Sequence, residues 1–112
     1  MTRGAVWLTA PGPRPWLRAG RHTPRAGSVA CDPLNALLRT IVVVPFTTNL
    51  RWARFPFCVP VSAGEGGLLS DSVALCHQVR VADKSRLVRR LGQLPEAVIV
   101  KVEQAMYVTL GL

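Results

Sequence analysis

The apolar run at residues 41–44 constrains the fold of this chain more than any other feature of its sequence. It consists of one isoleucine and three valines, whose branched Cβ atoms restrict their rotamers in a helix and suit a pleated sheet. Four consecutive apolar residues leave no polar face, so the run predicts a strand that is buried on both faces. Pro45 has no amide hydrogen to donate to a ladder, and we therefore expect this strand to stop at Pro45.

Polar groups follow this strand at the point where it should reach solvent. Thr47, Thr48 and Asn49 supply two hydroxyls and an amide, and the next residues add two guanidinium groups and an indole, from Arg51, Trp52 and Arg54. Hydroxyls and guanidinium groups hold a phosphodiester, and an indole stacks on a base. The set predicts contacts to single-stranded nucleic acid. The alternatives are solvated arginines, an ordinary strand-end hydroxyl, and a tryptophan that packs at a dimer interface.

A second polar set follows a predicted hairpin. Residues 55–61, interrupted by two prolines, indicate an edge strand, and the glycine-rich residues 64–67 allow the chain to reverse into a strand at 70–76. His77, Gln78 and Arg80 come at the end of that strand as a possible proton exchanger, a base-edge reader and a phosphate contact. The alternatives are a hydrogen-bonded surface imidazole for His77 and a solvated side chain for Arg80.

The C-terminal third is predicted to contain one helix. Asp83 is placed to cap a short basic turn at residues 84–91. Pro95 suits the first position of a helix, and Gly111 suits its end. Apolar or small residues recur between them at helical spacing, which predicts a face packed on the sheet. These residues are Val98, Val102, Ala105, Met106, Thr109 and Leu110.

Composition limits the size and the partners of the protein. A chain of 112 residues has room for one domain, which we place at residues 1–112, with a modest core. Fourteen Lys and Arg against six Asp and Glu give a net charge of +8 and a pI near 11.1, which favours a polyanionic partner. The alternative is that arginine is common only because the gene is GC-rich.

The cysteines and the hydropathy argue against several other classes of protein. Cys31, Cys58 and Cys76 are odd in number and lack a CxxC pair or a histidine cluster, so neither a disulfide framework nor a metal site is expected. We expect buried, reduced thiols and no cofactor. No stretch approaches the roughly 20 apolar residues of a membrane span, and residues 1–20 lack the apolar region of a signal peptide. The expected location is the cytoplasm.

Several motifs, taken together and in order, resemble one family. They are RGAVWL at residues 3–8, DPLN at 32–35, TIVVVPFTTNLR at 40–51, AGEGGL at 63–68 and DSVALCHQVRVADKSRL at 71–87. The chain resembles the MazF/PemK/Kid toxins of bacterial type II toxin-antitoxin systems. The resemblance implies a mainly β (α+β) fold, an SH3-like small β-barrel with a C-terminal helix, and a homodimer. It also implies metal-independent cleavage of single-stranded RNA, and an antitoxin partner whose acidic, disordered tail binds the toxin.

Residues 9–30 differ from the family pattern. By resemblance, the catalytic groups are the first threonine at the strand end, here Thr47, and the arginine of an Arg-Pro pair. Pro24 occupies that arginine's position, so Arg25 is the nearest substitute and lies one residue out of register. His77 stands where relatives have an acid, and we include it among the catalytic candidates. One hypothesis for the difference is a displaced reading frame between about residues 9 and 29, which the nucleotide sequence of the gene tests.

The sequence therefore predicts a sequence-specific endoribonuclease that inhibits translation and growth. Its substrate is mRNA, with rRNA or tRNA as alternatives. The altered Arg-Pro pair supports a rival hypothesis, a catalytically impaired homologue that binds antitoxin or RNA without cleaving. Cleavage of a long RNA in the presence of a chelator separates the two.

Overall fold

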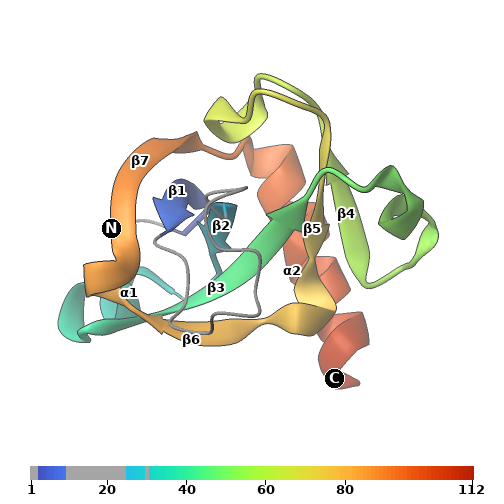
Figure 1. The fold of residues 1–112 in the computed structure, drawn as a ribbon. Coiled ribbons are helices and arrows are strands. Elements are labelled where there is room, and N and C mark those ends of the chain that lie inside the picture. Colours follow the sequence, from blue (N-terminus) through green and yellow to red (C-terminus); the bar gives the residue numbers. More distant parts are fainter. Residues whose placement is uncertain (1–2, 10–24, 30) are drawn as a thin grey trace, which may run out of the picture.

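The computed structural model describes residues 3–9, 25–29 and 31–112, whose strands form one bent antiparallel sheet with a long C-terminal helix packed on it (Figure 1). Six strands run in the order β4-β5-β3-β2-β1-β7, and β6 also pairs with β3. The strands are β1 (Ala5–Thr9), β2 (Arg25–Ser28), β3 (Thr40–Thr47), β4 (Cys58–Val61), β5 (Ser72–Leu75), β6 (Arg80–Asp83) and β7 (Leu87–Gln93). The helices are α1 (Asp32–Leu37) and α2 (Glu96–Leu110), with short 3₁₀ helices η1 (Leu50–Arg54), η2 (Glu65–Gly67), η3 (Cys76–Gln78) and η4 (Lys84–Arg86).

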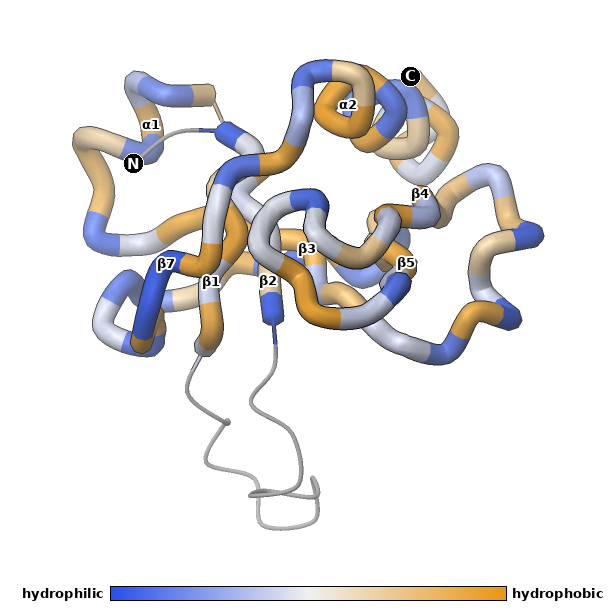
Figure 2. The backbone as a smooth tube through the Cα atoms, turned by 90° about the horizontal axis from the view of Figure 1, so that it is seen from above, coloured by the Kyte–Doolittle hydropathy of each residue, from blue (hydrophilic) through white to orange (hydrophobic). Residues whose placement is uncertain are grey.

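The expected mixed α+β fold with a C-terminal helix is confirmed, but the sheet of the described residues does not close into a barrel. Its order begins with β4 and ends with β7. Seen from above, α1 lies at one end of the molecule and β4 and β5 lie at the other (Figure 2). The predicted edge strand corresponds to β4, which pairs with β5 through the expected glycine-rich reversal.

The central strand β3 continues past Pro45 to Thr47, so the expected stop at Pro45 is wrong. On one side β3 pairs with β2, including Ala26 with Pro45. On the other side β6 pairs with residues 40–43 and β5 pairs with Phe46 and Thr47. Pro45 falls in the interval where β3 changes partner from β6 to β5, so its missing amide hydrogen interrupts neither of these two ladders.

The two faces of β3 pack against different cores. Val44 packs with α2 in the main core, and Phe46 packs against the same cluster. Ile41 and Val43 belong to a second cluster on the opposite face, together with Ala26 of β2. Because side chains alternate along a strand, Thr47 projects to the side of Ile41 and Val43. We call the first side the α2 face and the second the Thr47 face.

Helix α2 follows the predicted pattern at most positions. Pro95 precedes its first residue, Glu96 lies in its first turn, and Gly111 ends it in the left-handed conformation at φ 70°. The predicted core residues Val98, Val102 and Ala105 are buried, as is Ile99, which was not predicted. Leu110 is 57% exposed, so its predicted place in the core is wrong for the single chain.

The segment after β6 differs from the prediction. Asp83 caps η4, because its carboxylate accepts a hydrogen bond of 2.8 Å from the backbone N–H of Ser85. This bond lowers the pKa of Asp83. The predicted turn at 84–91, however, contains only one 3₁₀ turn, and β7 follows it, paired with β1. No helix within residues 3–9, 25–29 and 31–112 is both long and apolar enough to cross a membrane.

Candidate active site

Thr47 lies at the end of β3, half-buried, with its hydroxyl oxygen already engaged. The backbone N–H of Asn49 donates a hydrogen bond of 3.1 Å to Thr47 Oγ1, and the backbone N–H of Arg51 donates one of 3.2 Å to Asn49 Oδ1. These two bonds hold the exposed residues 48–51 in a tight turn. Because Oγ1 accepts from Asn49, its own hydrogen remains available, so the Thr47 hydroxyl is prepared to donate to an acceptor such as a phosphate oxygen.

An aromatic cluster occupies the same face of the sheet. Thr47 pairs with Val73 of β5, and directly paired residues project to the same side. Val73 packs with Cys58 and Leu75, against which the partly buried Trp52, Phe55 and Phe57 are packed. The indole of Trp52 is therefore near the strand end, as the sequence predicted, but Phe55 and Phe57 were not predicted to join it.

His77 is enclosed by this aromatic cluster. Its ring stacks on Trp52, with centroids 5.1 Å apart and an interplanar angle of 26°, and the edge of Phe57 lies 4.7 Å away. Nδ1 lies 3.8 Å from Cys58 Sγ and Nε2 lies 3.4 Å from Gln78 Nε2. The structure thus brings together three predicted site residues, Trp52, His77 and Gln78. Both ring nitrogens of His77 have polar neighbours, which fixes the orientation of the ring.

The thiol beside His77 is in its neutral form at ordinary pH. Burial raises the pKa of Cys58, and burial together with the neighbouring Cys58 raises the pKa of Cys76 to about 12. Cys76 begins the 3₁₀ helix η3, so the predicted strand ends earlier, at Leu75. Cys31 is exposed, in contrast to the expectation that all three thiols are buried. Among the described residues, no three His, Cys, Asp or Glu side chains come together as metal ligands.

Three of the predicted phosphate contacts are exposed guanidinium groups. Arg51 and Arg54 belong to η1, and Arg54 lies over the ring of Phe55 at 4.9 Å, a cation–π contact. Arg80 begins β6, opposite Val43. Paired residues project to the same side, so Arg80 projects from the Thr47 face.

Arg25 does not share a face with Thr47. Ala26 pairs with Pro45 and packs with Val43, which places Ala26 on the Thr47 face. Arg25 is its neighbour on β2 and therefore projects to the α2 face. Gly27 confirms this alternation, because a Cβ atom added to it would lie 3.2 Å from the ring of Phe46, an α2-face residue. The pairing of β2 with β3 therefore places Arg25 and Thr47 on opposite faces of the described sheet. Pro24 lies outside the described residues.

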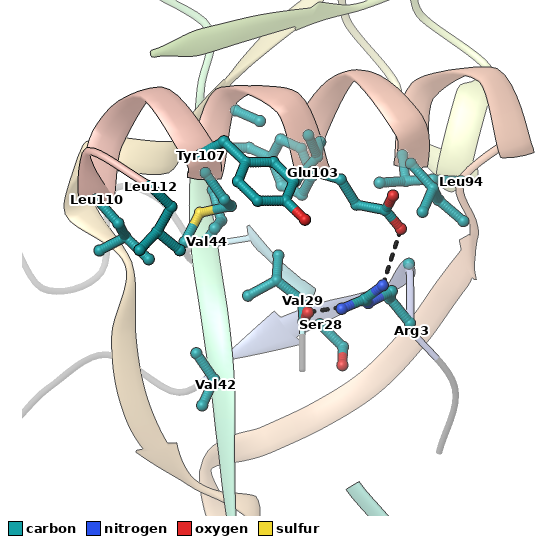
Figure 3. A pocket seen from close by; sticks show the side chains of 16 residues that line it. Arg3, Ser28, Val29, Val42, Val44, Leu94, Glu103, Tyr107, Leu110 and Leu112 are labelled. Carbon is teal, nitrogen blue, oxygen red and sulfur yellow. Dashed lines mark hydrogen bonds and ion pairs between the residues drawn. The ribbon is translucent and has the colours of Figure 1, made fainter. Parts of the chain in front are cut away.

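A groove of about 410 Å³ lies on the α2 face, between α2 and the sheet (Figure 3). Its lining is mainly apolar and includes Tyr107, Leu110 and Leu112, which are all more than half exposed. Arg3 and Glu103 form an ion pair of 2.8 Å beside it. None of the described residues that line this groove is a candidate catalytic group, and the apolar lining indicates a packing surface.

Comparison with known sequences identifies the family. The profile of the family described as PemK-like, MazF-like toxin of type II toxin-antitoxin system matches residues 2–110. The chain is 32% identical to Endoribonuclease MazF9 of Mycobacterium tuberculosis over 117 aligned positions that cover 100% of this chain and 98% of that protein. It is also 32% identical to Endoribonuclease EndoA of Bacillus subtilis over 78 residues, which are 70% of this chain and 67% of that protein.

Solved structures share the fold. An endoribonuclease in complex with its cognate antitoxin, from a mycobacterial species, superposes with a TM-score of 0.81 at 21% identity, covering 100% of this chain and 96% of that one. A MazE-MazF complex from Deinococcus radiodurans superposes with a TM-score of 0.75 at 24% identity, with coverage of 100% and 96%. The arrangement of sheet and C-terminal helix is therefore that of these structures.

Proposed function

Because the chain belongs to the PemK-like, MazF-like toxin family of type II toxin-antitoxin systems, we propose that it is a sequence-specific endoribonuclease and the toxin of such a system. It cleaves single-stranded RNA in the cytoplasm, and a cognate antitoxin inhibits it. The two relatives described above are named endoribonucleases, which supports the proposed cleavage of RNA. The net charge of +8 suits both RNA and an acidic antitoxin tail.

The proposal is supported most directly by the Thr47 hydroxyl, whose oxygen accepts a hydrogen bond from Asn49 while its hydrogen remains available to donate. In metal-free cleavage the 2′-oxygen attacks the adjacent phosphorus, so a P–O2′ bond forms while the P–O5′ bond breaks. The 2′-hydroxyl loses a proton, the 5′-oxygen gains one, and the products carry a 2′,3′-cyclic phosphate and a 5′-hydroxyl. Thr47 donates a hydrogen bond to a phosphate oxygen, which becomes more negative in the transition state.

The remaining residues on this side bind RNA or move protons. His77 is the candidate for proton transfer, and its neighbours hold the ring in one orientation. Trp52 and Phe57 offer aromatic surface to an unstacked base, and Gln78 offers an amide to a base edge. Thr48, Asn49, Arg51 and Arg54 line the turn and η1 beside Thr47 and meet the backbone of the RNA.

The apolar groove on the α2 face fits a second copy of the chain, and we expect a homodimer. The exposed side chains of Tyr107, Leu110 and Leu112 would be withdrawn from water in such a dimer. In this proposal the subunit contact and the candidate site lie on opposite faces of β3.

Cleavage by the purified protein tests the proposed function. Wild type and Thr47→Ala are incubated with a long RNA and a chelator, and fragment ends are mapped. We expect cuts at one short sequence by wild type only, because the alanine side chain of the variant has no hydroxyl donor, while both proteins show the same thermal unfolding. Fragments from neither protein would indicate the rival hypothesis, a homologue that binds RNA or antitoxin without cleaving.

A further inference from the structure

The proposed transesterification needs a cation on the Thr47 side of the sheet. Charge builds on the phosphate oxygens as phosphorus becomes five-coordinate, and a guanidinium group stabilises it through paired N–H donors. Arg25 projects to the α2 face and so cannot take this role beside Thr47 without a change in the register of β2. Another cation must therefore be close enough to reach the phosphate.

Arg80 is the described arginine that the strand register places on the correct face. It pairs with Val43, and Val43, Pro45 and Thr47 project to one side of β3 because they alternate with Val44 and Phe46. Arg80 is exposed, and no hydrogen bond or ion pair joins it to another described residue. Its guanidinium group is therefore free to meet a ligand.

The separation of Arg80 and Thr47 suits a phosphate held between them. Thr47 lies four steps along the strand from Val43, about 13 Å at ~3.3 Å per residue, and β6 lies ~4.8 Å to the side. The long arginine side chain has many rotamers, and an extended one covers part of this distance. A phosphate with a hydrogen bond of about 3 Å at each end spans the rest.

The chain between the two paired segments strengthens this placement. β5 ends at Leu75, β6 begins at Arg80, and both pair with β3. The intervening η3 carries His77 and Gln78, and it lies against β3. Arg80, Gln78, His77 and Thr47 thus follow one another along the same edge of β3, whereas Arg54 is engaged with the ring of Phe55.

We propose that Arg80 is the catalytic arginine of this chain and takes the place of the displaced Arg25 at the scissile phosphate. The inference rests on the proposed function, since it names a group in that reaction. Arg80 donates hydrogen bonds to the phosphate oxygens while the P–O2′ bond forms and the P–O5′ bond breaks. It keeps its proton throughout, and no electron is transferred to or from it.

The test compares Arg80→Gln with Arg25→Gln under single-turnover conditions with excess enzyme. Removal of one transition-state donor costs about 10²- to 10³-fold in rate, and we expect a loss of this size for Arg80→Gln. Arg25→Gln should keep nearly the wild-type rate. Because Arg80 is exposed, Arg80→Gln should unfold at the wild-type temperature, and the unfolding temperature of Arg25→Gln is measured beside it.

Chemical rescue separates catalysis from a structural role. Guanidinium ion at a non-denaturing concentration should restore part of the activity of Arg80→Ala, because the ion fills the space left by the side chain. The same ion should restore nothing to Thr47→Ala, which lacks a hydroxyl rather than a cation. If guanidinium ion does not rescue Arg80→Ala, and Arg80→Gln keeps normal activity, then Arg80 is not the catalytic arginine.

The other outcomes distinguish this inference from the proposed function. If Arg25→Gln is inactive and Arg80→Gln is active, the enzyme is a nuclease but the Arg80 assignment is wrong. If wild type cuts no RNA, a 2′-O-methyl RNA is used as a probe of binding. If wild type then binds more tightly than Arg80→Gln, Arg80 contacts a phosphate without catalysis. If the two proteins bind equally, both the proposed function and the Arg80 assignment are overturned.

Discussion

Two glycines in the reversal between β4 and β5 separate two contributions to the loss of stability on substitution by alanine. One contribution is the left-handed backbone, and the other is a steric clash of the added Cβ atom. Gly67 has φ +76°, and a Cβ atom there would lie 2.2 Å from the carbonyl oxygen of Leu91 in β7. Gly64 has φ +90° in the same reversal, but its added Cβ would meet nothing within 4 Å. The pair therefore differs in the clash and shares the left-handed backbone.

The two parts have different magnitudes. A left-handed conformation costs alanine about 1–2 kcal/mol, and the stiffer unfolded chain returns roughly 0.4–1 kcal/mol. Gly64→Ala should therefore lower the free energy of unfolding by about 0.5–1 kcal/mol. At Gly67 a backbone carbonyl must also move away, since real Cβ contacts are rarely under 3.0 Å. Overpacking of this kind adds about 1–3 kcal/mol, so Gly67→Ala should cost roughly 2–4 kcal/mol.

Urea denaturation measures both free energies. We expect an unchanged m-value and a midpoint that falls clearly further for Gly67→Ala than for Gly64→Ala. Gly92→Ala is a useful third variant, because its Cβ would lie 2.7 Å from the backbone carbon of Gly66 while its φ is not positive. Equal losses at positions 64 and 67 would refute the reasoning, because they would show that η2 does not press against β7.

Three further results are expected. Stability should fall as pH rises above about 9, because Cys76 ionises near pH 9.0 in the unfolded chain whereas burial raises its pKa to about 12 in the folded protein. Cys76→Ala should flatten this dependence on pH in thermal melts from pH 8 to 11. An unchanged slope would contradict the burial argument. Leu110→Glu should convert a dimer into a folded monomer in sedimentation experiments, since it charges the apolar groove; a persistent dimer would place the subunit contact elsewhere. Thr47→Ala and Arg80→Gln should be non-additive in cleavage rate, since both groups act on one phosphate; strictly additive losses would separate their roles.

Patterns within single segments predicted the elements whose structure is decided locally. The β-branched residues 41–44 form part of β3, and the glycine-rich reversal joins β4 to β5. Helix α2 ends at Gly111 as predicted and begins one residue after the predicted Pro95. Leu110 was misplaced because helical spacing identifies an apolar position but not the surface that covers it. Strand β7 was missed because LVRRLGQ has two adjacent arginines and no regular alternation, and because its partner β1 lies at the other end of the chain.

Which residues form the candidate site depends on the pairing register of β3 with its neighbouring strands, and this register could not be predicted from the sequence. Thr47 was predictable from the end of a buried strand, whereas the faces of Arg25 and Arg80 follow only from the pairings of β3 with β2 and β6. Cys58 and Phe57 likewise reach His77 through the packing of β4 against η3. A pair of residues on different strands is a site only when the register places both on one face.

We expect this chain to cleave RNA through the 2′-hydroxyl of the substrate, without a metal ion. The most direct measurement uses two oligonucleotides that contain the mapped cleavage sequence, one all-ribose and one with a single 2′-deoxy sugar immediately before the scissile phosphate. In the presence of a chelator, we predict that the first is cut to a cyclic phosphate and a 5′-hydroxyl and that the second stays intact although it binds. Equal cleavage of both oligonucleotides, or cleavage only when a divalent metal is added, would exclude this mechanism.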